Sequence, residues 1–244
     1  MHGANECLHI LHALPPLYAS LESLPGLSAH PAVAINHFPV NTPGIPKTPS
    51  RFEAACRRFD EENAQDPNQE LVDGVPQPRE LIYARWLTDW VLRLQPDASE
   101  VLRLAARCQH LCRWHIPRNS YPMTRAGYLQ WRSELKTFHA EKAGAILHEA
   151  GYDEETIRQV QELNLKKNFP SDPDSRVLED ALCLVFLERQ FTELARKTEA
   201  DKVINALQKS WKKMTPKARE FALQLDYAAN ERALLDRAQA EPGA

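Results

Sequence analysis

The spacing of apolar residues constrains the fold of this chain more than any other feature, because from Ser50 onward they recur every three or four positions. That period matches one face of an α-helix. The sequence has no segment that alternates apolar and polar residues between two turns, as a half-buried β-strand does, and it has no visible internal repeat. The sequence therefore predicts an all-α fold, a single multi-helix bundle of about seven or eight helices.

Capping and helix-breaking residues set the expected limits of these helices. Ser50 and Glu53 have the spacing of a capping box, and Pro or Gly residues separate the later segments. The last segment begins with Pro216 at its first helical position. The expected helices cover residues 51–63, 79–94, 99–114, 124–150, 153–164, 177–191, 201–214 and 215–237.

The segment from Val177 to Phe191 is the most apolar in the chain. Its apolar residues cover most of the helix circumference, which is typical of a helix that other helices surround. Glu179 and Asp180 interrupt this run. A carboxylate in a helix that is packed on all sides costs several kcal/mol unless a cation or a metal ion pairs with it.

The N-terminal stretch of the chain has a different composition. Eight of the 18 Pro residues lie before residue 50, together with a single basic residue, Lys47. This stretch has neither the charged start of a secretory signal nor the Arg-rich pattern of a mitochondrial presequence, and its apolar runs are too short to span a membrane. We expect an irregular tail over residues 1–50, with one short helix near residues 5–14 and five histidines without ligand spacing, and a helical domain over residues 51–244.

Charge and cysteine content exclude several classes of function. The 30 Lys and Arg residues nearly balance 33 Asp and Glu residues, which gives a net charge of −3. We therefore expect no membrane partner and no nucleic-acid partner unless a local basic patch exists. The 5 Cys residues are odd in number and lack CxxC spacing, which indicates a reducing compartment and a cytoplasmic location.

Two histidines and two carboxylates are placed where an apolar residue would be usual or where charged neighbours surround them. His139 lies on an apolar stripe of its helix, whereas His110 lies on a cationic and aromatic face. Together with Glu179 or Asp180 they could hold one divalent ion, Mn, Fe, Co or Zn. The alternative is that His139 is an ordinary core histidine and that the carboxylates pair with an arginine or with Lys166.

A second group combines guanidinium and aromatic side chains over a helix–loop–helix stretch. Arginine binds phosphate or carboxylate through two parallel hydrogen bonds, and aromatic rings stack on planar ligands. The pattern favours a nucleotide or a phosphorylated metabolite; alternatively, the rings are core residues on which the arginines stack. The residues are Arg113, Trp114, Arg118, Tyr121, Arg125, Tyr128, Trp131 and Arg132.

Several segments carry a resemblance to a known family, namely LAARCQHLCRWHIPR from residue 104, YPMTRAGYLQWR from 121, FHAEKAGAIL from 138 and LEDALCLVFLE from 178. Over residues 52–225 the chain resembles an all-helical family that is catalogued only as a domain of unknown function. Some members are labelled glutamyl-tRNA synthetase, which this sequence does not support because the strand–helix alternation of a Rossmann core is missing. The resemblance implies no established activity.

The order of these segments is also similar to that of HD-domain phosphohydrolases, which are all-helical and hold metal ions with His and Asp side chains. Leu111 stands where the paired Asp of that family belongs, and Lys166 and Lys167 replace another usual His. These departures favour one bound ion over two. The ligands that the resemblance implies here are His110, His139, Asp180 and Glu80.

Functions of different classes remain open. In the first, a metal-dependent HD-like hydrolase acts on a phosphorylated small molecule or nucleotide, and Glu179 or Glu141 transfers protons. Open coordination positions would equally allow single-iron oxygenase chemistry. In the second, a degenerate, metal-free HD-like module binds a nucleotide or a protein partner through the Arg/aromatic patch; a purely structural helical scaffold is the third. The expected contacts to the anionic ligand are Arg113, Arg118, Arg125, Arg132 and Lys167.

Overall fold

The structure is a computed structural model that describes residues 49–240. The expectations for the tail, including its short helix and its five histidines, lie outside these described residues. Among the helices from residue 51 to residue 240, none is both long enough and apolar enough to cross a membrane.

The described chain is mostly helical, as the apolar spacing predicts. Its N-terminal half contains α2 (Arg51–Asn63), α3 (Arg79–Leu94), α4 (Glu100–Cys108), α5 (Arg125–Glu149) and α6 (Glu154–Leu165). The predicted capping box starts α2, because Ser50 Oγ accepts a hydrogen bond from the Glu53 N–H at 3.2 Å and the Glu53 carboxylate accepts one from the Ser50 N–H at 2.8 Å. The limits of α2 and α3 agree with the prediction.

The C-terminal half contains α7 (Pro173–Val185), a π-helical turn (Phe186–Gln190), α8 (Phe191–Lys197), α9 (Ala200–Lys213), α10 (Pro216–Leu223) and α11 (Ala229–Ala240). The segment expected as one helix over 215–237 is therefore two helices. A second start signal separates them, since the Glu231 carboxylate accepts a hydrogen bond from the Ala228 N–H at 3.0 Å.

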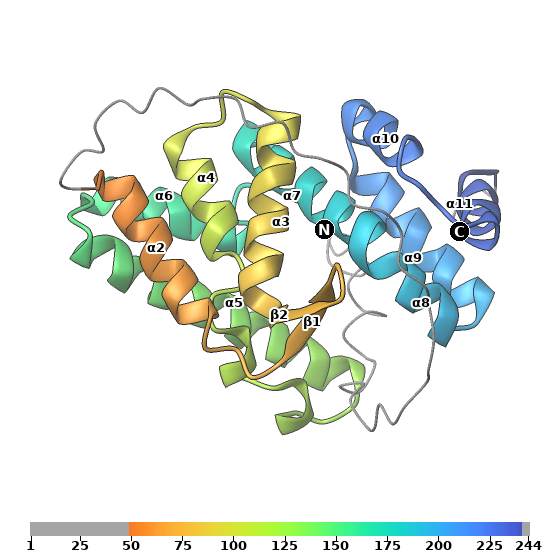
Figure 1. Ribbon diagram of the computed structural model, residues 1–244, viewed down its shortest axis with the longest axis horizontal. Coiled ribbons are helices and arrows are strands. Elements are labelled where there is room, and N and C mark those ends of the chain that lie inside the picture. The colour runs from red at the N-terminus through yellow and green to blue at the C-terminus, as the bar shows by residue number, and fades with distance from the viewer. Residues whose placement is uncertain (1–48, 241–244) are drawn as a thin grey trace.

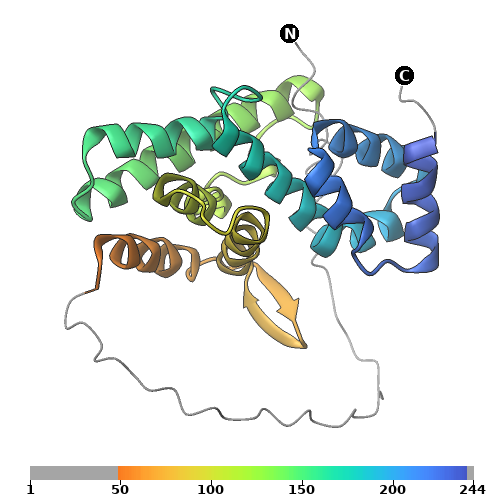
Figure 2. The same cartoon turned by 90° about the horizontal axis from the view of Figure 1, so that it is seen from above.

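Helix α7 lies at the centre of the bundle, as its composition predicts, and packs against α3, α4, α6, α9 and α10. In Figure 2 the paired helices α5 and α6, in green, lie at one side of the molecule, and the C-terminal helices, in blue, lie at the other. One hydrophobic cluster runs from Ala55 on α2 to Ala238 on α11. A second, smaller cluster joins Tyr128, Trp131 and Leu135 near the start of α5.

A β-hairpin connects α2 to α3, and here the sequence prediction is wrong. Strand β1 (Gln69–Val72) pairs antiparallel with β2 (Val75–Pro78) (Figure 1). Asp73 and Gly74 join them with φ angles of 51° and 79°, the left-handed conformation that short hairpin turns require. The strands are half-buried or exposed throughout, so no buried face imposes the alternation by which a strand is recognised in a sequence.

Helix α4 ends at Cys108, well before the predicted limit at residue 114. The chain then turns, and Cys112 adopts a left-handed φ of 52° while its N–H donates to Asn63 Oδ1 on α2 at 2.9 Å. Short 3₁₀ turns follow at Arg113–His115 and Arg118–Ser120. This turn brings the side chains of Gln109, His110 and Arg113 to one pocket instead of distributing them around a helix.

Candidate functional site

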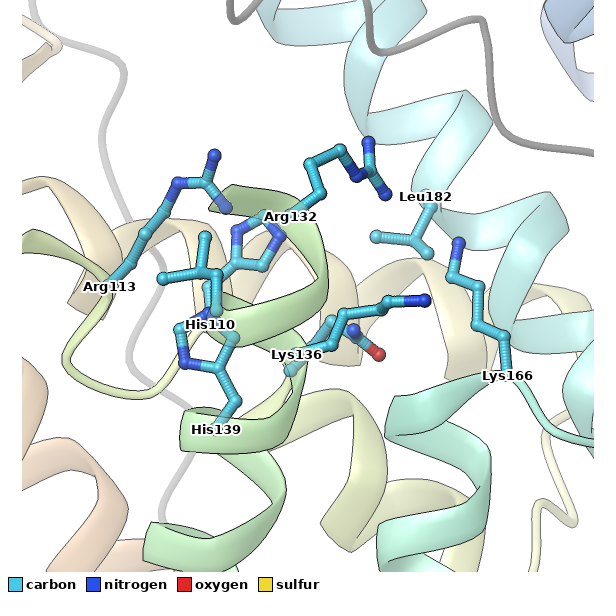
Figure 3. Close-up of a pocket in the computed structure, with 9 residues that line it drawn as sticks. His110, Arg113, Arg132, Lys136, His139, Lys166 and Leu182 are labelled. Carbon is cyan, nitrogen blue, oxygen red and sulfur yellow. The ribbon is translucent and has the colours of Figure 1, made fainter. Parts of the chain in front are cut away.

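A small pocket lies where the end of α4, helix α5, the end of α6 and helix α7 meet (Figure 3). Its volume is about 30 Å³, measured as the space open to the centre of a water molecule. A single water needs about 10–15 Å³ on that measure, so the space suits a group of a few heavy atoms, such as a tetrahedral oxyanion. Two leucines line it together with the polar residues Gln109, His110, Arg113, Arg132, Lys136, His139 and Lys166.

Helix α5 supplies the largest share of the pocket. Arg132, Lys136 and His139 follow one another at intervals of four and three residues, which places them on one face of the helix. In Figure 3 the side chains of Lys136 from α5 and Lys166 from the end of α6 approach the same space from different elements. The lining thus combines four cationic side chains with no carboxylate.

The two pocket arginines are held by aromatic rings. The guanidinium of Arg113 lies 4.9 Å from the ring centroid of Trp131, and its Nε is 3.8 Å from Glu80 Oε1. Burial lowers the pKa of Arg113, an effect that Glu80 opposes. Arg132 donates a hydrogen bond to the Tyr128 hydroxyl at 3.2 Å. Aromatic contact fixes both side chains without neutralising them, and the carboxylate of Glu80 lies near Arg113 alone of the two.

Lys136 has no hydrogen-bond or ion-pair partner within residues 49–240, although it is half-buried. Burial lowers the pKa of Lys136, and the nearby charges of Arg132 and Lys166 lower it further. All three causes act against a positive charge. The ammonium group therefore lies in surroundings that lack an anion.

Lys166 reaches the pocket from a left-handed position, with φ 56° at the C-cap of α6. Its ammonium pairs with the carboxylate of Glu179 on α7, which also accepts from Lys213 Nζ at 3.0 Å. Burial alone would raise the pKa of Glu179, but the two lysines outweigh it and hold that pKa at about 2. Glu179 is consequently a fixed anion that positions Lys166.

Glu80 on α3 lies beside the pocket in very different surroundings. Its Oε2 is buried without a hydrogen-bond partner in the described part of the chain, and the nearest basic atom is His110 Nδ1 at 3.4 Å. Burial raises the pKa of Glu80 to about 7, against the attraction of Arg113. The His110 ring stacks on Tyr83 with centroids 4.3 Å apart, and burial lowers the pKa of His110, so this imidazole is neutral.

His139 is oriented by the backbone of the turn after α4. Its Nδ1 lies 2.7 Å from the carbonyl oxygen of Leu111. Because a carbonyl only accepts, Nδ1 carries the proton and Nε2 carries a lone pair. Nε2 is buried and has no hydrogen-bond partner among the residues that the structure describes.

Residues 53–235 match the family described as Domain of unknown function (DUF4202). The chain belongs to this family. Membership in a family of unknown function is thus confirmed, whereas the similarity to HD-domain proteins stays a prediction. No match was found among curated proteins or among solved structures.

The DUF4202 domain does not gather the four predicted metal ligands. His110 and Glu80 are close, and the rings of His110 and His139 are 6.0 Å apart. Asp180, however, accepts hydrogen bonds from the backbone and the hydroxyl of Thr215, and so caps α10. Among residues 49–240, no three His, Cys, Asp or Glu side chains form a group that could hold a metal ion. These donors, surrounded by cations, do not fit a divalent metal.

The predicted proton-transfer and anion-binding residues of the DUF4202 domain separate into two sets. Arg113 and Arg132 line the pocket, whereas Glu141 is exposed on α5. Outside the pocket, Arg118 donates to the carbonyls of Tyr121 and Pro122. Two further cations also lie outside the lining, and these are the exposed Arg125 and Lys167.

Lys136, Lys166 and Gln109 are polar pocket residues that the sequence analysis does not assign to a ligand site. A usable pattern existed for Lys136, because it lies four residues after Arg132 and three before His139 on one helix. Gln109 had no such pattern, since its place depends on the turn that ends α4. The alternative that Glu179 pairs with Lys166 agrees with the observed ion pair.

Proposed function

We propose that the pocket binds an oxyanion, such as the phosphate group of a small molecule, without a metal ion. The observation that carries the proposal is Lys136, a half-buried cation with no anionic partner among the described residues and with Arg132 and Lys166 as its charged neighbours. The arginine-rich stretch of the sequence favours an anionic ligand. The proposal keeps that ligand and requires no metal ion.

Charge balance supports this assignment. Like charges that share a buried site repel each other strongly because little water screens them. Glu179 compensates Lys166, but it also pairs with Lys213. An anion bound between Arg132 and Lys136 would remove the remaining repulsion and would accept charge-assisted hydrogen bonds. A divalent cation in the same place would add to the repulsion.

The size of the pocket supports a compact ligand group. Its volume of about 30 Å³ suits one phosphate or carboxylate group, and the rest of a larger ligand would extend toward solvent. Metal-dependent hydrolysis stays an untested prediction, and the donor set described above gives no observation in its favour.

Titration calorimetry with inorganic phosphate tests the proposal. We expect phosphate to bind the wild-type chain, and Lys136→Met to weaken that binding by roughly 10- to 100-fold, because a charged hydrogen bond is lost. The matched control is Lys167→Met, which removes an exposed lysine outside the pocket and should leave the affinity unchanged.

A stability measurement separates loss of the site from loss of the fold. Without phosphate, Lys136→Met should be at least as stable as the wild type, because the substitution removes a repelled charge. The proposal fails if phosphate does not bind the wild-type chain, or if the Lys136 and Lys167 variants bind it equally.

A further inference from the structure

The pocket lining contains two buried acceptor atoms without a partner among the described residues, Gln109 Oε1 and His139 Nε2, and oxyanion binding alone explains neither. Every cationic side chain of the pocket offers hydrogen-bond donors, which suit the oxygen atoms of an anion. His139 is different, because its Nδ1–H is used by the Leu111 carbonyl at 2.7 Å and its Nε2 offers a lone pair. A lone pair that faces an anion oxygen is repulsive unless that oxygen carries a hydrogen.

Because Nε2 of His139 is buried, it can discriminate between ligands that donate a hydrogen bond to it and ligands that do not. The His139 side chain is only 3% exposed, so bulk water does not satisfy Nε2. Burial, His110 and Arg113 all lower the pKa of His139, which keeps the ring neutral and Nε2 an acceptor. A buried acceptor that a ligand leaves unpaired costs about 1–3 kcal/mol.

We infer that His139 Nε2 accepts a hydrogen bond from the ligand, so that the pocket selects an oxyanion that carries one O–H, as hydrogen phosphate does, over one that carries none, as sulfate does. This inference rests on the proposed oxyanion binding and adds its specificity. Arg132 and Lys136 bind the charged oxygens, and His139 accepts a hydrogen bond from the single protonated oxygen. Its role is to determine specificity, and it requires no chemical step.

Two sources can supply this ligand chemistry. Free phosphate keeps at least one O–H at neutral pH. The phosphate group of a monoester carries its O–H only below a pKa of about 6. Methyl phosphate therefore distinguishes them: binding near that of phosphate at about pH 5 indicates a monoester, and no binding at any pH indicates free phosphate. Either result agrees with selection of the O–H.

The test compares the affinities of phosphate and sulfate, measured by calorimetry near neutral pH. We expect the wild-type chain to prefer phosphate by roughly 10- to 100-fold. His139→Asn retains an N–H donor close to the position of Nδ1 and removes the acceptor, so the two anions should bind it about equally. The matched control is His148→Asn, which changes an exposed histidine on the same helix and should keep the preference.

Nitrogen-15 NMR of the wild-type imidazole rings gives a second readout that needs no variant. Phosphate should shift the His139 Nε2 resonance, and sulfate should leave it in place. Equal affinity of the wild-type chain for the two anions, or an unchanged preference in His139→Asn, overturns the inference while the proposed oxyanion binding stands. Failure of both anions to bind removes the proposed function itself.

Discussion

Glu179 on α7 and Glu80 on α3 are two buried carboxylates beside the same pocket, and the groups around them have opposite effects. Glu179, 4% exposed, is paired with Lys166 and Lys213 and has a pKa near 2. Glu80, 6% exposed, has an oxygen with no hydrogen bond from any described residue and a pKa near 7. Burial is nearly the same, so the difference lies in the partners.

This comparison shows why a buried carboxylate in an apolar helix is weak support for a metal site. The cost of burying Glu179 is offset by two lysines from other elements, which sequence periodicity does not reveal. The ion pair of Glu80 with Arg113 is longer, at 3.8 Å, and does not offset burial, so Glu80 shifts toward its neutral form instead. The charges of the lysines and arginines therefore exceed those of the carboxylates around the pocket, and the net charge of the site is positive.

The largest expected effect concerns the paired carboxylate. Glu179→Gln removes the carboxylate with which the largely buried Lys166 and Lys213 both pair, and should lower the free energy of unfolding by about 3–5 kcal/mol. Urea denaturation measures this loss. Glu193→Gln, which removes a half-exposed partner of Arg196, is the matched control and should cost less than about 1 kcal/mol. A similar cost for both variants would remove the distinction between buried and surface pairing.

The next effect concerns Glu80 and the dependence of stability on pH. The pKa of Glu80 rises from its ordinary value of 4.5 to about 7, so the folded state binds the proton more tightly than the unfolded state. The stabilisation that this proton provides is fully present below about pH 4.5 and is lost as the pH rises through about 7. The total loss is about 3 kcal/mol.

Glu80→Gln should abolish this loss and make the variant more stable than the wild type above about pH 7. The pKa of Glu179 is instead lowered to about 2, so its contribution is present above about pH 4.5 and is lost as the pH falls toward about 2. Unfolding free energies measured from about pH 2 to pH 9 test both signs. Parallel curves for the wild type and Glu80→Gln would contradict the assignment.

The smallest expected effect concerns the left-handed backbone conformation of Lys166. Its φ of 56° favours glycine, and the side chain at this position is held by Glu179. Lys166→Gly and Lys166→Ala both lose the ion pair and should both weaken phosphate binding. The Lys166→Gly variant should nevertheless be more stable than Lys166→Ala by about 1 kcal/mol, because glycine adopts the left-handed conformation without strain. Equal stability would show that Lys166 is not strained.

Local signals predict the fold better than they predict the site. Capping residues and apolar spacing were sufficient for α2 and α3, because the relevant contacts lie within a few residues. The early end of α4 depends on Asn63 of α2, which accepts from the Cys112 N–H across the bundle. The hairpin and the break before α11 were missed, although Asp73–Gly74 and the Glu231 cap are local signals.

The site depends mainly on contacts between distant segments. The role of Asp180 follows from Thr215, and that of Glu179 from Lys166 and Lys213. No spacing within α7 reveals those partners. The cationic face of α5 was readable, since Arg132 and Lys136 are one helical turn apart.

The measurement that tests the central claim most directly is a crystal structure with heavy-atom probes. Arsenate carries an O–H as phosphate does, and its arsenic atom is located by anomalous scattering, as is manganese. After separate soaks, we expect an arsenic peak in the pocket within hydrogen-bond distance of Lys136 and Arg132, and no manganese peak there. A manganese peak bound to His110 and His139, with no arsenic peak in the pocket, would contradict the account.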